Sequence, residues 1–579
     1  MGVCGRGGRA GGSRPTTLNR VARVVPDIPT FAVDSGFAYE IPERLSDITI
    51  GSLVRIPLGG RTVAGFVVDV GDHDPTGLRQ IKSARGAVFN QALLSVLKWA
   101  ATHYVAPLSV LLAKAAPPNL PRVSAAPQPA GKLRAATALL ANPYRDSWWD
   151  ELDTEGGVVV VATEAELNRF AEPLRHFVGD RLVIARPTGG DAHLTTAWEG
   201  AATRPEAVLL GTPRVALWPT AGAGHLIAIE EGRRAMKDRQ TPTLSVREIM
   251  RRRAQLERRA ATFVGPTPTL ETLAAGALVR GPVGRNRVWP LVEIVKRDAD
   301  HRGFLTPTAL AALKAVTRGG GSSFVFCHRR GYAPAVRCVR CRTVRQCPSC
   351  GARPDRGLNC VRCGAQLGPC QQCGADRFEP LGAGVGAVGE ELRHRLGDLI
   401  RGGTTPITVG SEADLADPPI FDLAVAVDAD GLMLGPNYRA AEEALRVLAR
   451  LACLLKPGTG RRLIVQTALP AHPVIDALRR GRPMEFLMDE LEARRGLGYP
   501  PAGELMILEV RDGSTTNHRE LEEAVAGNDL FGPALSSRGS RWLIQGHDLH
   551  APKQRLRPLI QRWRDAGASV RVDVDPIDL

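Results

Sequence analysis

The sequence predicts a multidomain α/β protein with a small β-rich module in front and a metal-binding ribbon inserted into its second half. Three observations predict this architecture. Short strands separated by turn residues dominate positions 21–70, longer apolar strands alternate with helical stretches from about position 158, and eight of the eleven cysteines form four C-x-x-C pairs between positions 338 and 373. Continuous apolar strands are typical of parallel sheets that are buried on both faces by helices.

The bulk composition is that of a globular, basic protein. A chain of 579 residues is long enough for three to five domains, and its formal charge is +15. Only nine of the 75 basic residues are lysine. Arginine binds phosphate in a bidentate way that lysine cannot, so the composition favours nucleic acid as a partner, although a general bias toward arginine would give the same numbers.

No segment of the sequence is typical of a membrane or secreted protein. A membrane span needs about 20 mostly apolar residues, and no uncharged apolar stretch approaches that length. Residues 1–18 contain arginine and glycine but no apolar core, so we expect a disordered tail and not a secretory signal. The predicted location is the cytoplasm, with no membrane partner.

The front module is predicted at residues 19–115. Its strands are expected at 21–25, 37–41, 52–58 and 62–70, and a helix follows from about Asn90. Prolines and alanines dominate residues 116–131, which are expected to form a linker.

Two sets of apolar strands follow this linker. We expect the first at 158–162, 181–185, 207–211 and 225–229, and the second at 322–326, 406–410, 423–428 and 462–466. These sets predict two α/β lobes, residues 132–285 and 286–470. The cysteine block, 337–374, falls inside the second lobe, and residues 471–579 are predicted to form a mixed α/β C-terminal domain.

The cysteine pattern predicts two structural zinc ions per chain. A zinc ion bound by thiolates alone needs four sulfurs, and each C-x-x-C turn supplies two of them. Disulfides suit small secreted domains better, and an iron–sulfur cluster is a second alternative. Spacing alone allows three ways of combining the turns. The eight predicted ligands are Cys338, Cys341, Cys347, Cys350, Cys360, Cys363, Cys370 and Cys373.

Several segments resemble the primosomal protein N′ (PriA) family, helicase-like proteins that restart stalled replication forks. They include FAYEIPERL (37–45), LLGTPRVALW (209–218), PTPTLETL (266–273) and ELEARRGLGYPPAGEL (490–505). The resemblance implies that Cys338, Cys341, Cys370 and Cys373 hold one zinc and that the four inner cysteines hold the other. It also implies a 3′-DNA-end-binding front module that contacts DNA through Phe37, Tyr39, Gly59 and Lys82, with Ala38 where the family has an aspartate.

The ATP-hydrolysis motifs that the resemblance implies are degraded in this chain. No G-x-x-x-x-G-K-T phosphate-binding loop is present, and Trp148 and Trp149 occupy the place of its lysine and threonine. The magnesium-binding D-E-E-H reads Ile229-Glu230-Glu231-Gly232, and the two glutamates are expected to be solvated. The arginine-finger segment reads ARLACLLKPG (449–458), and Arg450 is expected on a helix surface.

These observations predict a replication restart protein with two degenerate helicase-like lobes and no helicase activity of its own. The partners implied are branched and single-stranded DNA at forks, primosome components, the replicative helicase or its loader, and single-stranded DNA-binding protein. Whether ATP still binds is left open by the sequence. Two alternatives are an active ATP-dependent 3′ to 5′ DNA helicase and a zinc-ribbon accessory protein of RNA metabolism.

Overall fold

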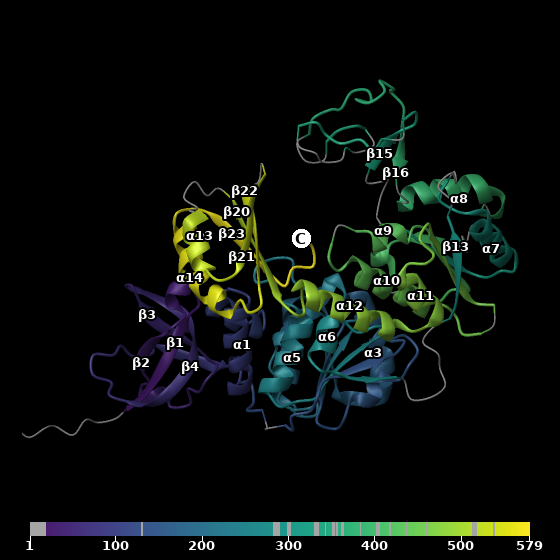
Figure 1. The fold of residues 1–579 in the computed structure, drawn as a ribbon. Coiled ribbons are helices and arrows are strands. Elements are labelled where there is room, and N and C mark those ends of the chain that lie inside the picture. Colours follow the sequence, from purple (N-terminus) through teal and green to yellow (C-terminus); the bar gives the residue numbers. More distant parts are fainter. Residues whose placement is uncertain are drawn as a thin grey trace, which may run out of the picture.

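The fold consists of four sheets and a two-stranded ribbon, arranged as a front module, two lobes and a C-terminal sheet (Figure 1). The computed structural model describes residues 19–128, 131–281, 290–297, 303–328, 335–341, 343–349, 354, 357–360, 364–381, 384–400, 406–415, 419–435, 437–458, 460–511, 518–536 and 539–579. The predicted tail, residues 1–18, lies outside the described residues.

The front module is an antiparallel sheet in the order β2-β1-β4-β3-β5. Its strands are β1 (Asn19–Pro26), β2 (Phe37–Glu40), β3 (Ser52–Leu58), β4 (Arg61–His73) and β5 (Ser83–Ala87). Backbone bonds between Glu40 and residues 79 and 81 bring β2 beside the segment leading into β5, so the sheet curls into a small barrel. The predicted helix is confirmed as α1 (Gln91–His103), capped by the Asn90 side chain, and α2 (Leu108–Ala115) follows.

Lobe 1 is a seven-stranded parallel sheet in the order β12-β6-β11-β10-β7-β9-β8. The four predicted strands are confirmed, and three more were missed. The strands are β6 (Thr137–Leu140), β7 (Gly157–Val160), β8 (Leu182–Ala185), β9 (Val208–Gly211), β10 (His225–Ile229), β11 (Ala261–Gly265) and β12 (Leu278–Arg280). The helices are α3 (Glu164–Val178), α4 (Gly190–Thr203), α5 (Val246–Leu256) and α6 (Leu270–Ala274).

Lobe 2 is a five-stranded parallel sheet in the order β13-β19-β18-β14-β17. Its strands are β13 (Leu291–Lys296), β14 (Ser323–Phe326), β17 (Ile407–Gly410), β18 (Leu423–Ala426) and β19 (Arg462–Thr467). Its helices are α7 (Pro307–Arg318), α8 (Val385–Ile400), α9 (Asp430–Met433), α10 (Ala440–Cys453), α11 (Pro473–Arg480) and α12 (Pro483–Leu497). The cysteine block projects from this lobe on the ribbon of β15 (Ala335–Cys338) and β16 (Phe378–Leu381), as Figure 1 shows.

The C-terminal sheet is antiparallel, in the order β21-β22-β20-β23. It comprises β20 (Glu504–Arg511), β21 (Asp529–Ser536), β22 (Gly539–Gly546) and β23 (Ser569–Val574), with α13 (His518–Ala524) and α14 (His550–Asp565). One continuous apolar core joins this sheet to α1 and α2 of the front module and to lobe 1. Among the described residues, no helix is long and apolar enough to cross a bilayer.

The proline- and alanine-rich segment predicted as a linker lies against the domains on both sides of it. The Ala125 amide donates to the carbonyl of Ala87 in the front module, and the Ala126 amide donates to that of Ala202 in lobe 1. Ala125 is itself buried. The described part of this segment is therefore fixed in place and does not act as a free tether.

Candidate functional site

The aromatic residues predicted to bind DNA lie in two different environments. Phe37 begins β2 and is 40% exposed, so its ring is available to stack on a nucleotide base. Tyr39 is only 4% exposed, and its hydroxyl donates to the Pro57 carbonyl at 3.0 Å. Tyr39 thus belongs to the core of the barrel, which leaves its ring no open face for a base.

Gly59 and Lys82 lie near each other at one end of the barrel. Gly59 and Gly60 form the two-residue turn between β3 and β4, and both have positive φ, which explains why glycine stands there. A Cβ added at either glycine would meet no atom within 4 Å, so a ligand can approach the backbone closely. The Lys82 ammonium donates to the Thr62 hydroxyl at 2.6 Å, just beyond this turn. The arrangement offers a cation and an open backbone turn for a phosphate.

The structure corrects the expectation that Glu230 and Glu231 are solvated. Both follow β10 directly, and their side chains are buried, with 3% and 4% exposure. Lobe 2 covers this edge of the lobe 1 sheet, and sequence reasoning did not foresee that contact. Glu230 also has φ of +52°, a left-handed conformation that non-glycine residues adopt at a cost of about 1 to 3 kcal/mol.

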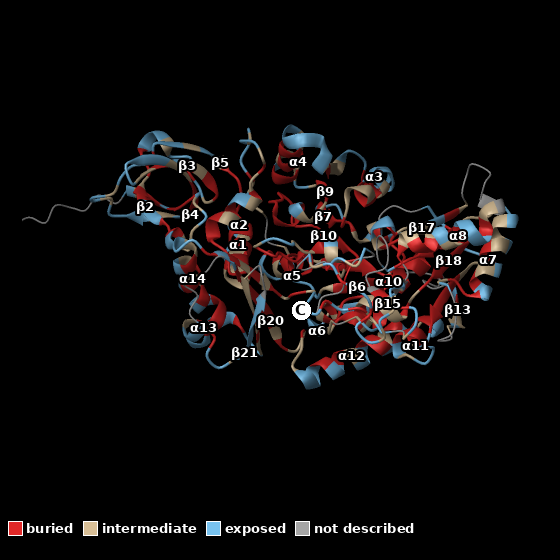
Figure 2. Ribbon diagram, turned by 90° about the horizontal axis from the view of Figure 1, so that it is seen from above, coloured by how far each residue is buried: buried red, intermediate tan, exposed pale blue. Residues whose placement is uncertain are grey.

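The expectation that Arg450 lies on a helix surface is wrong. Arg450 is fully buried, and its Nε lies 3.0 Å from the Glu230 carboxylate across the interface between the lobes. Figure 2 shows its helix, α10, as largely buried. The charged positions of α10 recur at helical spacing, which is typical of a solvated face, but here that face meets lobe 1.

Three residues that sequence reasoning missed complete this cluster. Glu166 of α3 pairs with Arg233 and lies 3.2 Å from Arg450. The Tyr144 hydroxyl, from the loop after β6, donates to Glu166 at 3.3 Å and accepts from Arg450 at 3.3 Å. Burial raises the pKa of Tyr144 well above its usual value, so it stays protonated. We call Tyr144, Glu166, Glu230, Arg233 and Arg450 the first seam cluster; its two arginines balance its two glutamates.

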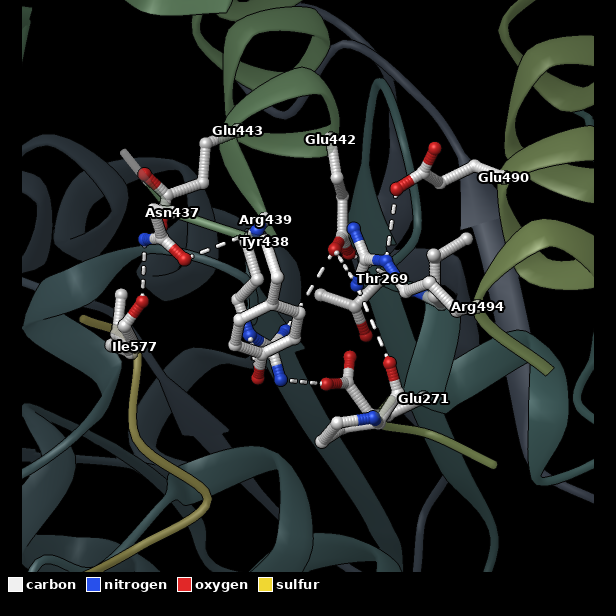
Figure 3. Close-up of polar contacts among 12 residues, drawn as sticks. Thr269, Glu271, Asn437, Tyr438, Arg439, Glu442, Glu443, Glu490, Arg494 and Ile577 are labelled. Atoms are coloured by element: carbon white, nitrogen blue, oxygen red, sulfur yellow. Dashed lines mark hydrogen bonds and ion pairs between the residues drawn. The ribbon is translucent and has the colours of Figure 1, made fainter. Parts of the chain in front are cut away.

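A second cluster lies beside the first and involves α6, α10 and α12 (Figure 3). Glu271 of α6 accepts from Arg439, and from Arg247 at 3.1 Å. Glu442 of α10 accepts from the Leu270 amide at 3.1 Å and lies 2.9 Å from Arg494 of α12. We call Arg247, Glu271, Arg439, Glu442 and Arg494 the second seam cluster. It joins lobe 1 to lobe 2 through groups that are all largely withdrawn from water.

Among the described residues, the cavity between the lobes is small. This cavity, lined by Glu231, Thr269, Arg439 and Arg446 among others, has a volume of about 40 Å³. Small-molecule sites usually offer about 300 to 1,000 Å³. Ile229 stands where the resemblance implies a magnesium-holding aspartate, and the next carboxylate, Glu230, lies 3.0 Å from Arg450. The residues present therefore do not fit ATP and magnesium.

We expect the seam to weaken in acid. Burial alone would raise the pKa of Glu271, but Arg247 and Arg439 outweigh it and hold the pKa at about 2. A carboxyl whose pKa is lower in the folded state stabilises the fold above its unfolded pKa, and that stabilisation is lost as pH falls through about 2. Urea unfolding midpoints between pH 6 and pH 2 should fall for the wild type and change less for Glu271→Gln. Equal pH dependence of the two proteins would contradict this expectation.

The four outer cysteines form a candidate metal centre. The sulfurs of Cys338, Cys341, Cys370 and Cys373 all lie within 4.8 Å of one another. In the described part of the chain this is the one group of its kind. Four thiolates at this spacing fit a tetrahedral zinc ion, which would fix the two turns relative to each other. The grouping is the one that the resemblance implies for the outer pairs.

The inner zinc site stays a prediction. Cys347 and Cys360 are buried together with Leu367, which is compatible with a shared site. Their predicted partners, Cys350 and Cys363, lie outside the described residues.

Comparisons with known proteins agree with this architecture. Residues 23–117 match the family model of the PriA 3′DNA-binding domain (3′BD). The replication restart protein PriA of Synechocystis sp. is 26% identical over 437 residues, which cover 65% of this chain and 51% of that protein. The probable replication restart protein PriA of Mycobacterium tuberculosis is 25% identical over 655 residues, which cover 94% of this chain and 99% of that protein.

Other similarities are more distant. The replication restart protein PriA of Treponema pallidum is 23% identical, with 96% of this chain and 99% of that protein covered. Among solved structures, RecG bound to a three-way DNA junction is 10% identical with a TM-score of 0.33, covering 63% of this chain and 47% of that one. The chain thus spans about half the length of the Synechocystis relative and nearly all of the mycobacterial and treponemal ones. The chain is thus similar to replication restart proteins named PriA over most of its length, and residues 23–117 match the PriA 3′DNA-binding domain.

Proposed function

We propose that this chain is a replication restart factor that binds stalled or abandoned forks through its front module. The observation that carries the proposal is the match of residues 23–117 to the PriA 3′DNA-binding domain, on which Phe37 is exposed and Lys82 lies near the open Gly59 turn. Stacking on Phe37 and a phosphate contact from Lys82 would hold a single-stranded end without reading its sequence.

The proposed factor acts without hydrolysing ATP. The phosphate-binding loop is missing from the sequence, and Arg450 occupies the carboxylate of Glu230. In phosphoryl transfer an arginine finger must reach the transferring phosphate, and an acidic residue must hold magnesium. Here Arg450 is paired with Glu230, and Ile229 stands where the magnesium-holding aspartate is expected. The first seam cluster therefore argues against the alternative of an active helicase.

In this account the chain promotes restart by assembling other proteins on the fork. The two lobes and the projecting cysteine block offer surface for primosome components, for the replicative helicase or its loader, and for single-stranded DNA-binding protein. Zinc at the outer cysteines would keep the block folded, as a structural and not a catalytic ion, because four thiolates leave no open position for water. The alternative of an RNA accessory protein is disfavoured by the match of the front module.

Binding to forked DNA should depend on Phe37. The Phe37→Ala variant should weaken binding by about 1 to 3 kcal/mol, because it removes the ring on which a base stacks. Fluorescence anisotropy with a labelled fork measures this. Phe177→Ala is the matched control, since Phe177 on α3 is 42% exposed and Phe37 is 40% exposed. Equal affinities of the two variants would contradict the role of Phe37.

The same assay tests the phosphate contact and the 3′ end. Lys82→Ala should lower the slope of log affinity against log salt by about one unit, whereas Lys98→Ala on α1 should not. Because Ala38 cannot accept a hydrogen bond from a terminal hydroxyl, a 3′-phosphate on the leading strand should cost little affinity. A large loss with the blocked fork would show that the end is recognised despite Ala38.

A further inference from the structure

The segment from Asp573 to Asp578 touches three other parts of the molecule. The Lys237 ammonium of lobe 1 donates to the Asp573 carboxylate at 2.6 Å and to the carbonyls of Val574 and Asp575 at 2.8 and 2.7 Å. The carboxylate of Asp575 lies 3.2 Å from His103 of the front module. Asp575 has φ of +51°, so the backbone turns sharply as it leaves β23.

The segment then runs on between the two lobes. The Asn437 amide of lobe 2 donates to the Ile577 carbonyl at 2.6 Å, a contact drawn in Figure 3. The Asp578 carboxylate accepts two bonds from Arg234 of lobe 1, at 2.5 and 2.8 Å. Arg234 also pairs with Glu443 of α10 at 3.0 Å. The same short segment is therefore tied to the front module, to lobe 1 and to lobe 2.

Apolar contacts reinforce these polar ones. Leu270 belongs to α6 of lobe 1, yet it is fully buried within the core cluster of lobe 2, together with Val447 and Leu487. Tyr144 and Leu273 of lobe 1 pack against the same cluster. Separating the lobes would return this apolar surface to water and break both seam clusters at once. If the lobes opened, water could solvate the charged groups again. Exposing the Leu270 side chain to water would instead cost free energy, because its apolar surface would be hydrated.

We propose that the seam is a permanent lock, and that residues 573–578 form a strap that holds it shut and fixes the front module to both lobes. In this design Arg450 and Arg439 bind carboxylates of the neighbouring lobe in place of a nucleotide. The lobes keep one relative position whether or not ATP is present. The front module is then held at a fixed angle to the surface on which partners assemble.

Single-molecule energy transfer between the lobes tests the lock. Labels introduced through non-natural amino acids at the exposed Arg175 and Arg479 avoid the thiols of the metal cluster. The full-length wild type should give one narrow distribution that ATP and magnesium leave unchanged. A second population in the wild type, or a shift on adding ATP, would overturn the proposal.

Hydrogen exchange of the α6 amides tests the strap. Asp578→Asn removes charge from an exposed contact and should leave the fold intact, yet it should speed exchange in α6 by about two- to fivefold, because the ion pair that ties the strap to Arg234 is weakened. Asp476→Asn, whose pairs with Arg479 and Arg480 lie within one helix, is the matched control. Equal exchange in both variants would refute the strap. If the lobes open but the chain still binds forked DNA, this inference is refuted and the proposed function is not. If the lobes stay together but the chain does not bind DNA, only the proposed function is refuted.

Discussion

Replacing Arg450 by methionine should destabilise the folded chain by about 3 to 5 kcal/mol, because it leaves buried carboxylates without their counter-charge. Arg450 is fully buried, and it faces both Glu230 and Glu166. Methionine fills much of the same volume, so the loss measures charge more than packing. Urea unfolding followed by circular dichroism gives the free energy of unfolding.

Two further variants make the test of Arg450 specific. The double variant Arg450→Met with Glu230→Gln leaves Glu166 paired with Arg233, so charge balance returns and most of the lost stability should be recovered. The Arg495→Met variant breaks an exposed pair with Glu492 and should cost less than about 1 kcal/mol. A double variant as unstable as Arg450→Met alone would show that the seam does not depend on charge balance.

Removal of the outer metal should unfold the cysteine block and leave the lobes intact. Cys338→Ser should lose one equivalent of zinc by elemental analysis, and proteolysis within the block should accelerate, because structural zinc in small sites supplies about 10 to 16 kcal/mol of binding free energy. The block projects from lobe 2 on a two-stranded ribbon, so the effect should stay local.

The control for Cys338→Ser is a substitution of Cys453, a cysteine outside the metal cluster. A serine would not be a clean control at this position, because Cys453 is fully buried in α10, where a hydroxyl would need a partner. Cys453→Ala is therefore the matched control, and it should retain all the zinc of the wild type. Unchanged zinc content in Cys338→Ser, or an iron–sulfur absorption band, would contradict the metal assignment.

The sequence was informative wherever a feature repeats along the chain. Period-two and continuous apolar patterns predicted four of the five strands of the front module and eight strands of the lobes. The C-x-x-C spacing predicted the cysteine ligands, four of which the structure brings together at the outer site. Such patterns are local, because each turn or strand carries its own chemistry.

The sequence was misleading where function depends on contacts between distant segments. Arg450 and Glu230 are 220 positions apart, and each alone is typical of a solvated charge. Only the packing of α10 against the edge of the lobe 1 sheet reveals them as partners. The same is true of Tyr144, which no motif distinguishes and which lies at the centre of the first seam cluster.

ATP hydrolysis by the wild type, measured with and without a saturating fork, tests the central claim most directly. The account predicts that the protein binds the fork and yet shows no DNA-stimulated phosphate release. No phosphate-binding loop is present, Ile229 stands where a magnesium-holding aspartate is expected, and Arg450 is paired with Glu230. Fork-stimulated turnover that Glu230→Gln abolishes would contradict the account, since it would require the lobes to open and Glu230 to serve a bound nucleotide.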